Sequence, residues 1–235
     1  MLTIDNIRIR YGNSSSYVLK DLFLSLEPGI HGLVGLNGAG KTTLLNAIYR
    51  FIPINEGRIT FNGSPLRRAD IAYLEMDNYF YPQMTGHEYL QLFTAPPGAP
   101  FDQSGWQQLF SLPLDDITEN YSTGMRKKLA LMAVIKTGKP IILLDEPFNG
   151  LDLEGVRLLT MILNHLRSAG NGKTIIITSH IYETLADSCD CIHYLSEGRI
   201  LRRYSRHEFS LLRDELNTLI SERASELIQR LLPNS

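Results

Sequence analysis

A glycine-rich segment at residues 35–42 constrains this chain more than any other feature. It consists of Gly-Leu-Asn-Gly-Ala-Gly-Lys-Thr and matches the pattern G-x-x-x-x-G-K-[ST]. An apolar run at 30–34 precedes it, and a helical pattern over about 41–49 follows it. Glycines let backbone N–H groups close around an anion without Cβ clashes, and the start of a helix directs its positive dipole end to the same place. The segment therefore predicts a strand, a phosphate-binding turn and a helix.

The residue types inside this turn suggest individual roles. Lys41 is placed to reach the β- and γ-phosphates of ATP, and the Thr42 hydroxyl to hold Mg²⁺. The residues expected around the phosphates are Asn37, Gly38, Ala39, Gly40, Lys41, Thr42 and Thr43. The alternative is a purely structural glycine turn, and the predicted strand and helix on either side argue against it.

A second apolar segment, at 141–144, ends in the two carboxylates Asp145 and Glu146. In an α/β sheet, ligands bind at the carboxyl ends of the strands. We therefore expect Asp145 to hold Mg²⁺ and Glu146 to orient and deprotonate the attacking water. Taken alone, the pair is equally well interpreted as a polar cap on a buried strand. A phosphate loop in the same chain favours catalysis.

Hydrophobic patterning predicts an α/β core with two additions. A small, partly antiparallel front sheet is expected from segments 2–10, 18–26 and 58–61. Core strands are expected at 30–34, 71–74, 141–144 and 173–178, a helix at 153–168, and a hairpin at 191–195 and 199–204. Residues 77–136 are mostly helical in pattern, with a proline-rich loop at 96–100, and predict a helical lobe inserted in the core. A capping box at Ser205 predicts a helical tail to about Leu232.

Composition limits the function classes. The formal net charge of −2 argues against a nucleic-acid partner, which usually requires a basic excess. Cys189 and Cys191 are poorly placed to bridge each other, and we expect reduced thiols. The longest apolar runs are far too short to span a bilayer, and the N-terminus lacks the apolar core of a signal peptide. A membrane role would therefore need a partner that supplies the spanning helices.

Residues 121–129, Tyr-Ser-Thr-Gly-Met-Arg-Lys-Lys-Leu, open a helical pattern shortly before the acidic strand. The segment resembles the signature motif of ATP-binding cassette (ABC) proteins, usually written L-S-G-G-Q. Ser122 and Gly124 match that motif, whereas Tyr121, Thr123 and Met125 replace its Leu, first Gly and Gln. The Y-S-x-G-M form is similar to cassettes of multidrug-type exporters. The resemblance implies that Ser122 and Gly124 face the γ-phosphate bound by a second subunit.

Three further positions match the family in order along the chain. Residues 149–152, Asn-Gly-Leu-Asp, are similar to the D-loop, which implies that Asp152 belongs to the nucleotide site. His180 is similar to the switch histidine that contacts the γ-phosphate, and joins Glu146 and Lys41 as a catalytic candidate. Tyr11 is similar to the aromatic residue that stacks on adenine. The resemblance covers about residues 2–204, and the tail is less informative.

One position departs from the family pattern. The family commonly has Y-L-P-Q after the strand that leads into the helical lobe, and this chain has Tyr-Leu-Glu-Met at 73–76. Met76 therefore occupies the place of a glutamine whose amide oxygen approaches Mg²⁺ and the attacking water. A thioether is a poor Mg²⁺ ligand. We expect Thr42, Asp145 and the phosphates to hold the ion without a side chain from this loop.

The resemblance implies the α/β fold of an ABC ATPase: a P-loop NTPase core, a front antiparallel β-subdomain and an inserted helical lobe at about 77–136. The ATPase domain would span 1–204 and the C-terminal helical tail 205–235. The cofactors implied are ATP and Mg²⁺. The implied partners are a transmembrane permease subunit and a second ATPase chain, in a homodimer or heterodimer. The expected place of action is the cytoplasm, on the inner face of the cell membrane.

Three alternatives to an exporter subunit stay open on the sequence. Soluble cassettes that act on ribosomes or DNA typically carry two cassettes or a long insertion, and this chain has neither. A cassette that serves cofactor assembly, such as an iron–sulfur scaffold, is not excluded by the composition. A regulatory nucleotide-binding module without turnover is favoured only by Met76, and the presence of Glu146 argues against it.

Overall fold

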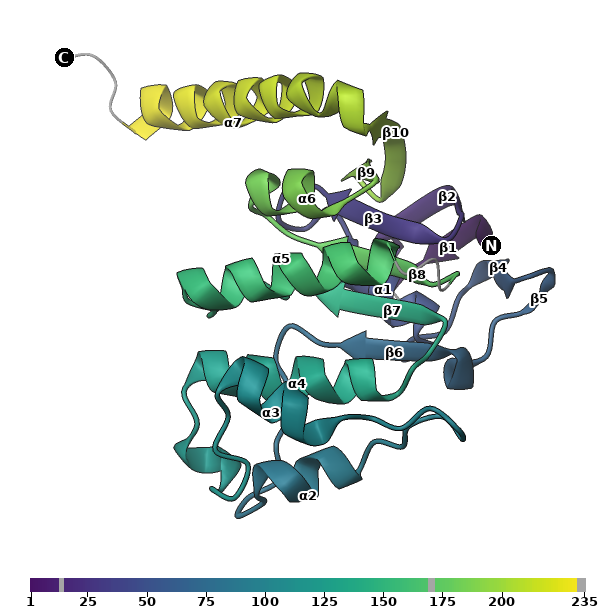
Figure 1. Ribbon diagram of the computed structural model, residues 1–235. Coiled ribbons are helices and arrows are strands. Elements are labelled where there is room, and N and C mark those ends of the chain that lie inside the picture. The colour runs from purple at the N-terminus through teal and green to yellow at the C-terminus, as the bar shows by residue number, and fades with distance from the viewer. Residues whose placement is uncertain (13–14, 169–171, 232–235) are drawn as a thin grey trace.

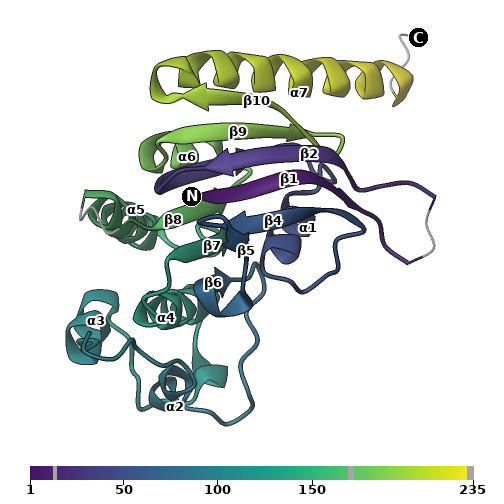
Figure 2. The same ribbon diagram turned by 90° about the vertical axis from the view of Figure 1, so that its right-hand side faces the viewer.

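The computed structural model describes residues 1–12, 15–168 and 172–231, in which two sheets lie against each other (Figures 1 and 2). The larger sheet has six strands in the order β10-β9-β3-β8-β7-β6. Its strands are β3 (Gly29–Val34), β6 (Ile71–Leu74), β7 (Ile141–Asp145), β8 (Thr174–Thr178), β9 (Cys191–Ser196) and β10 (Arg199–Ser205). All pairs are parallel except β9 with β10. Both faces of the parallel strands are covered, which explains why β6, β7 and β8 are continuous apolar runs, whereas the edge strand β10 is largely exposed.

The second sheet is antiparallel, in the order β2-β1-β4-β5. Its strands are β1 (Leu2–Ile9), β2 (Leu19–Leu26), β4 (Glu56–Phe61) and β5 (Ser64–Pro65). Leu2, Ile4, Ile7 and Ile9 of β1 all point into the core, because a bulge at Asn6 shifts the alternation by one residue. The expected front sheet is confirmed, and the two-residue strand β5 was not anticipated.

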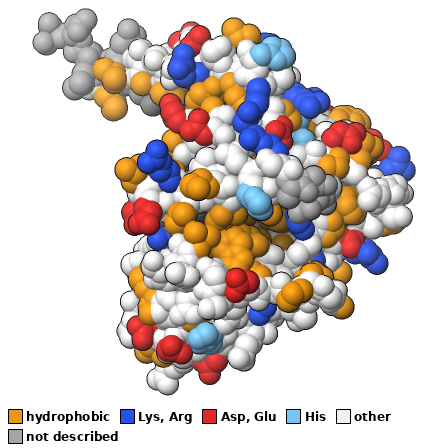
Figure 3. Space-filling model, viewed as in Figure 1, with side chains coloured by type: hydrophobic (Ala, Val, Ile, Leu, Met, Phe, Trp, Pro, Cys, Tyr) orange, Lys and Arg blue, Asp and Glu red, His pale blue; other side chains and the backbone are white. Residues whose placement is uncertain are grey.

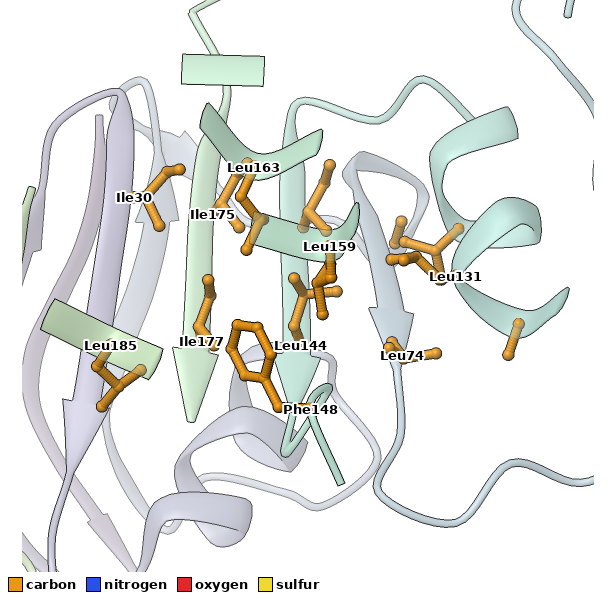
Figure 4. Close-up of a cluster of buried hydrophobic side chains, with 14 of the residues drawn as sticks. Ile30, Leu74, Leu131, Leu144, Phe148, Leu159, Leu163, Ile175, Ile177 and Leu185 are labelled. Atoms are coloured by element: carbon orange, nitrogen blue, oxygen red, sulfur yellow. The ribbon is translucent and has the colours of Figure 1, made fainter. Parts of the chain in front are cut away.

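Two apolar layers hold the molecule together. Helix α1 (Lys41–Ile48) packs between the sheets, where Leu44 and Leu45 meet Leu33, Leu143 and the inner face of the front sheet. The other face of the large sheet is covered by α4 (Thr123–Lys136), α5 (Leu153–Ser168) and α6 (Tyr182–Ser188). Figure 4 shows this second layer, in which Leu159 and Leu163 of α5 lie over Leu144, Ile175 and Ile177. Helix α6 was not expected from the sequence.

The segment 77–136 forms the expected lobe, with less helix than predicted. Besides α4 it holds only α2 (Gly86–Gln91), α3 (Gln103–Phe110) and a single 3₁₀ turn at Thr118–Asn120. Pro82, the prolines at 96–100 and Pro113 interrupt the helical pattern, because proline has no N–H and restricts the residue before it. Figure 3 shows hydrophobic side chains in the middle of this face, between the lobe and α5.

The tail helix α7 (Phe209–Leu231) begins after a 3₁₀ turn at Arg206–Glu208, and the predicted capping box between Ser205 and Glu208 is present. Phe209, Leu212 and Leu216 join the core, and the helix lies above α6 in Figure 1. Residues 232–235, at the end of the expected tail, lie outside the described residues. None of the helices described is both long and apolar enough to cross a bilayer.

Candidate nucleotide site

The glycine-rich turn joins β3 to α1, as predicted, and two of its glycines are required by space and conformation. A Cβ on Gly35 would lie 2.2 Å from the carbonyl oxygen of Leu195. Gly40 has a φ of 105° and stands at the N-cap of α1, where no described side chain accepts a hydrogen bond from the first turn. The first N–H groups of α1 are therefore available to an anion.

Lys41 lies in the turn with its ammonium group against the protein. Its Nζ donates a hydrogen bond to the carbonyl oxygen of Gly35, at 2.7 Å. Burial lowers the pKa of Lys41, while the charges of Glu146 and Asp145 raise it in part. This half-buried cation beside the free N–H groups of α1 is suited to a phosphate, which would be a stronger acceptor than the carbonyl.

Oxygen ligands for a hard cation converge at the ends of two neighbouring strands. The Thr42 hydroxyl donates to Oδ2 of Asp145 at 2.9 Å, and the Thr178 hydroxyl at the end of β8 donates to Oδ1 at 2.6 Å. The Tyr73 hydroxyl lies 3.5 Å from the same Oδ2. The pKa of the Tyr73 phenol is raised, mainly by burial and secondly by the negative charge of Asp145. A hydroxyl and a carboxylate in this arrangement fit Mg²⁺, which prefers oxygen ligands.

Glu146 is held in a strained backbone conformation directly after β7. Its φ is 49°, in the left-handed region that non-glycine residues rarely adopt. Its N–H donates to the Thr178 hydroxyl at 2.9 Å, and its Oε2 lies 2.9 Å from Nδ1 of His180 and 3.3 Å from the His180 backbone nitrogen. The strained turn and these contacts fix the carboxylate beside the phosphate loop.

These groups surround one pocket of about 510 Å³. It is lined by Val18, Asn37, Gly38, Gly40, Lys41, Thr42, Thr43, Met76, Glu146, Asn149 and His180. Most of the residues predicted for phosphate binding and catalysis thus face a common space at the carboxyl ends of β3, β7 and β8. Such an edge is where α/β sheets bind their ligands.

Ala39 and Tyr11 lie beside the pocket without lining it. Ala39 is buried inside the turn, where its N–H donates to the carbonyl of Leu36 at 3.1 Å. Tyr11 is half exposed, and its hydroxyl lies 3.1 Å from the Thr43 hydroxyl. The tyrosine ring is therefore tethered to the start of α1, at the rim of the site.

The signature residues lie around a different pocket. It has a volume of about 360 Å³ and is lined by Ser122, Thr123, Gly124, Met125, Lys128, Gly150 and Asp152. The Ser122 hydroxyl caps α4 by accepting from the N–H of Met125 at 3.2 Å, and Asp152 caps α5 by accepting from the N–H of Gly155 at 2.7 Å. A Cβ on Gly124 would lie 3.0 Å from the carbonyl of Gly150, which explains the glycine.

Four residues near the nucleotide pocket were missed by sequence reasoning: Val18, Tyr73, Lys127 and Thr178. Thr178 carried a usable signal, since it is a polar residue at the carboxyl end of a core strand. Lys127 carried none, because its position depends on how α4 packs against the loop after β6. Its Nζ donates to the carbonyl of Met76 at 2.8 Å.

The fold and this site define a P-loop nucleotide-binding protein. A family model described as "ABC transporter" matches residues 19–149, which is more than half of the chain. The chain therefore belongs to the ABC transporter family, and it is an ATP-binding, ATP-hydrolysing subunit of such a transporter. Subunits of this kind form dimers and work with membrane permease partners.

Individual relatives agree with the family assignment. The bacitracin transport ATP-binding protein BcrA of Enterococcus faecalis is 27% identical over 220 residues, which cover 88% of this chain and 70% of BcrA. The lantibiotic transport ATP-binding protein SrtF of Streptococcus pyogenes is 27% identical over 209 residues, which cover 86% of this chain and 89% of SrtF. A solved ATP-binding subunit of an ABC transporter is 25% identical with a TM-score of 0.79, covering 94% of this chain and 99% of that one.

Proposed function

We propose that this chain powers export through a separate permease, from the cytoplasmic face of the cell membrane. The Y-S-x-G-M form of the signature supports export, and the relatives named above are transport proteins by name. In this proposal residues 1–204 form the ATPase domain and residues 205–235 a helical tail. The permease selects the cargo, since the ATPase subunit touches only the nucleotide and its protein partners.

In the proposed site the phosphates of ATP bind between the turn at 37–40 and the N-terminus of α1. Lys41 moves its Nζ from the Gly35 carbonyl to the β- and γ-phosphates. Thr42 and Asp145 hold Mg²⁺, which neutralises phosphate charge when bound. Tyr11, tethered at the rim, stacks on adenine.

Glu146 is the proposed general base for the attacking water. Its carboxylate lies in the same pocket as Lys41, and His180 holds one of its oxygens, which leaves the other oxygen to accept the proton of a water. His180 stands at the mouth of this arrangement, where its ring contacts the γ-phosphate.

The observation that carries this proposal is the division of the residues between two pockets on one chain. Lys41 and Glu146 line the first pocket, and Ser122, Gly124 and Asp152 line the second. A second chain in head-to-tail orientation brings its signature pocket over the first chain's phosphates. Free N–H groups at the start of α4 then face the γ-phosphate, as donors for the developing charge. The partner chain is a second copy or a related cassette.

Glu146→Gln tests the chemistry of this proposal. The amide keeps the shape and most hydrogen bonds of the carboxylate but accepts no proton. ATP binding should therefore persist, while turnover falls by ~10²–10⁴-fold, and the variant should accumulate as an ATP-bound dimer in size-exclusion chromatography. A matched control is Glu222→Gln, which changes an exposed glutamate of α7 in the same way. Unchanged turnover in Glu146→Gln would remove this residue from the role of base.

A further inference from the structure

Away from the nucleotide pocket, three polar side chains meet inside the layer between the two sheets. His31 belongs to β3, and Cys191 and His193 belong to the adjacent parallel strand β9. Two residues further along each strand, Leu33 and Leu195 lie in the apolar cluster between the sheets, so the three side chains point into the same layer. They are 5%, 2% and 3% exposed.

The potential ligand atoms of this cluster are mutually close. His31 Nδ1 lies 3.1 Å from Cys191 Sγ and 3.4 Å from His193 Nε2, and the sulfur lies 3.5 Å from the same Nε2. Around one metal ion with bonds of about 2.0 Å to nitrogen and about 2.3 Å to sulfur, ligand atoms are spaced by roughly 3.3–3.7 Å. The separation of the two nitrogens matches this spacing, whereas a trigonal ion requires the two nitrogen–sulfur edges to open by about 0.6 Å and about 0.2 Å.

The orientation of His31 is that of a metal ligand. Its Nε2 lies 2.7 Å from the carbonyl oxygen of Glu27, and because a carbonyl only accepts, this nitrogen carries the proton. Nδ1 is then the unprotonated nitrogen, and its lone pair is directed at Cys191 and His193. Metal-binding histidines commonly donate their other N–H to a backbone carbonyl in this way, which fixes the tautomer and the ring.

Nothing outside the cluster explains why a second imidazole is buried here. Nδ1 of His193 has no hydrogen-bond partner among the residues that the structure describes, and Nε2 lies within hydrogen-bond distance of Cys191 and His31. Burial lowers the pKa of both histidines, that of His193 to about 3, so both rings are neutral. An apolar residue would cost less in this layer than an incompletely bonded imidazole.

We propose that His31, Cys191 and His193 form a binding site for one Cu⁺ ion. Two imidazoles and one cysteine are the donor set that trigonal copper sites use, and sulfur selects thiophilic ions. Cu⁺ and the Cys191 thiolate together carry no net charge, and the nearby Arg203 and Asp190 also cancel each other. Zn²⁺ would leave one positive charge in an apolar layer and would need a fourth ligand.

The site has a structural role in this proposal. The ion ties β3, which leads into the phosphate loop, to β9 at the end of the strands opposite the nucleotide. Burial, offset in part by Arg203 of β10, raises the pKa of the Cys191 thiol, so the ion itself would displace the thiol proton to solvent as the bond to sulfur forms. Because the side chains are buried, the ion would enter during folding.

The test uses the full chain and Cu⁺ alone as the probe. The protein is refolded without oxygen in the presence of Cu⁺, and metal retained after passage over a copper chelator is measured. We expect one Cu⁺ per chain and a copper–sulfur absorption band in the ultraviolet. Cys191→Ser should lose the band, and His31→Asn and His193→Asn should each weaken Cu⁺ binding by more than about 10-fold. ATP binding by each variant shows that it has folded.

Cys189→Ser is the matched control, because Cys189 is an equally buried thiol two residues from Cys191 with no place in the cluster. It should retain the full copper content. X-ray absorption of copper in the parent protein should show one sulfur and two nitrogens. No retained copper, equal retention by Cys191→Ser, or preferential retention of Zn²⁺ from an equimolar mixture would each overturn the proposal.

Discussion

Lys127 carries an ammonium group into the interior beside the nucleotide site. Its side chain is 5% exposed, and its Nζ donates to the carbonyl of Met76 on the loop after β6. Burial lowers the pKa of Lys127, and the nearby Asp77, Asp145 and Glu146 raise it in part. The bond links the signature helix α4 to the loop in which Met76 replaces the family's glutamine. We infer that the bond from Lys127 to the Met76 carbonyl fixes the position of this loop, because the Met76 side chain is a poor metal ligand.

Lys127→Met separates positioning from stability. Lys127 forms no ion pair among the residues that the structure describes, so the substitution removes one hydrogen bond and should change the free energy of unfolding by on the order of 1 kcal/mol. The loop at Met76 would lose its anchor. We therefore expect ATP turnover to fall several-fold while thermal unfolding changes little, both measured on the purified chain.

Lys136→Met is the control for this experiment. Lys136 lies on the same helix, and its Nζ also donates to a backbone carbonyl, that of Leu90, at 2.8 Å. This bond lies within the helical lobe, so the substitution should leave ATP turnover close to the parent. Equal losses of turnover in both variants would show that Lys127 acts only through the stability of the lobe.

At individual positions, the sequence identified the candidate site residues but not the contacts that orient them. The phosphate loop and the acidic pair were found because their chemistry needs those residues in that order. The contacts that orient them were not found. The bridge from Thr178 to both Asp145 and Glu146 depends on β8 lying beside β7, and the bond from Lys127 depends on packing across 51 positions of the chain. The spacing of residues along the sequence shows neither that β8 pairs with β7 nor that Lys127 packs against the loop at Met76.

Among the elements, α7 shows how one face of an amphipathic helix is fixed. Leu212 is fully buried in the main core, whereas the preceding Leu211 is 53% exposed. Tyr182 of α6 donates its hydroxyl to the carbonyl of Phe209, which fixes the start of the helix. The first turns of the tail are therefore part of the folded body.

Leu212→Ala should destabilise the chain by ~2–5 kcal/mol, since it removes apolar area and leaves a cavity beneath the first turns of α7. Leu211→Ala, one position earlier on the exposed face, should change the free energy of unfolding by no more than about 0.5 kcal/mol. Denaturant unfolding of both variants measures the difference. Similar values would mean that α7 does not depend on this face for its attachment.

Strands that are buried in the core were predicted more reliably than helices at the surface. Every core strand was expected within a residue or two, because a buried parallel strand is a short apolar run with few other interpretations. The lobe was expected with too much helix, since periodicity alone does not show where proline and local packing stop it. Helix α6 begins at Tyr182 with no side-chain cap, so it lacked the usual signal at its start.

For the molecule as a whole, we propose that each chain carries two half-sites. The glycine-rich turn and the residues of the signature line separate pockets. In the proposed dimer a single chain would not surround the γ-phosphate that it binds, and two chains related head to tail would complete two sites at once, with ATP in each site as part of the interface. Closure of the dimer would follow ATP binding, and opening would follow hydrolysis.

Complementation between two inactive variants tests this claim most directly. Lys41→Ala removes the phosphate-binding cation, and Ser122→Arg blocks the signature pocket. Each variant alone should have no significant ATPase activity. After mixing in equal amounts, half of the dimers are mixed, and each mixed dimer holds one site built from two unaltered halves. We expect about a quarter of the parental activity to return on mixing. If the mixture stays as inactive as its components, although chromatography shows mixed dimers, each site is completed within one chain and the two chains do not share their sites.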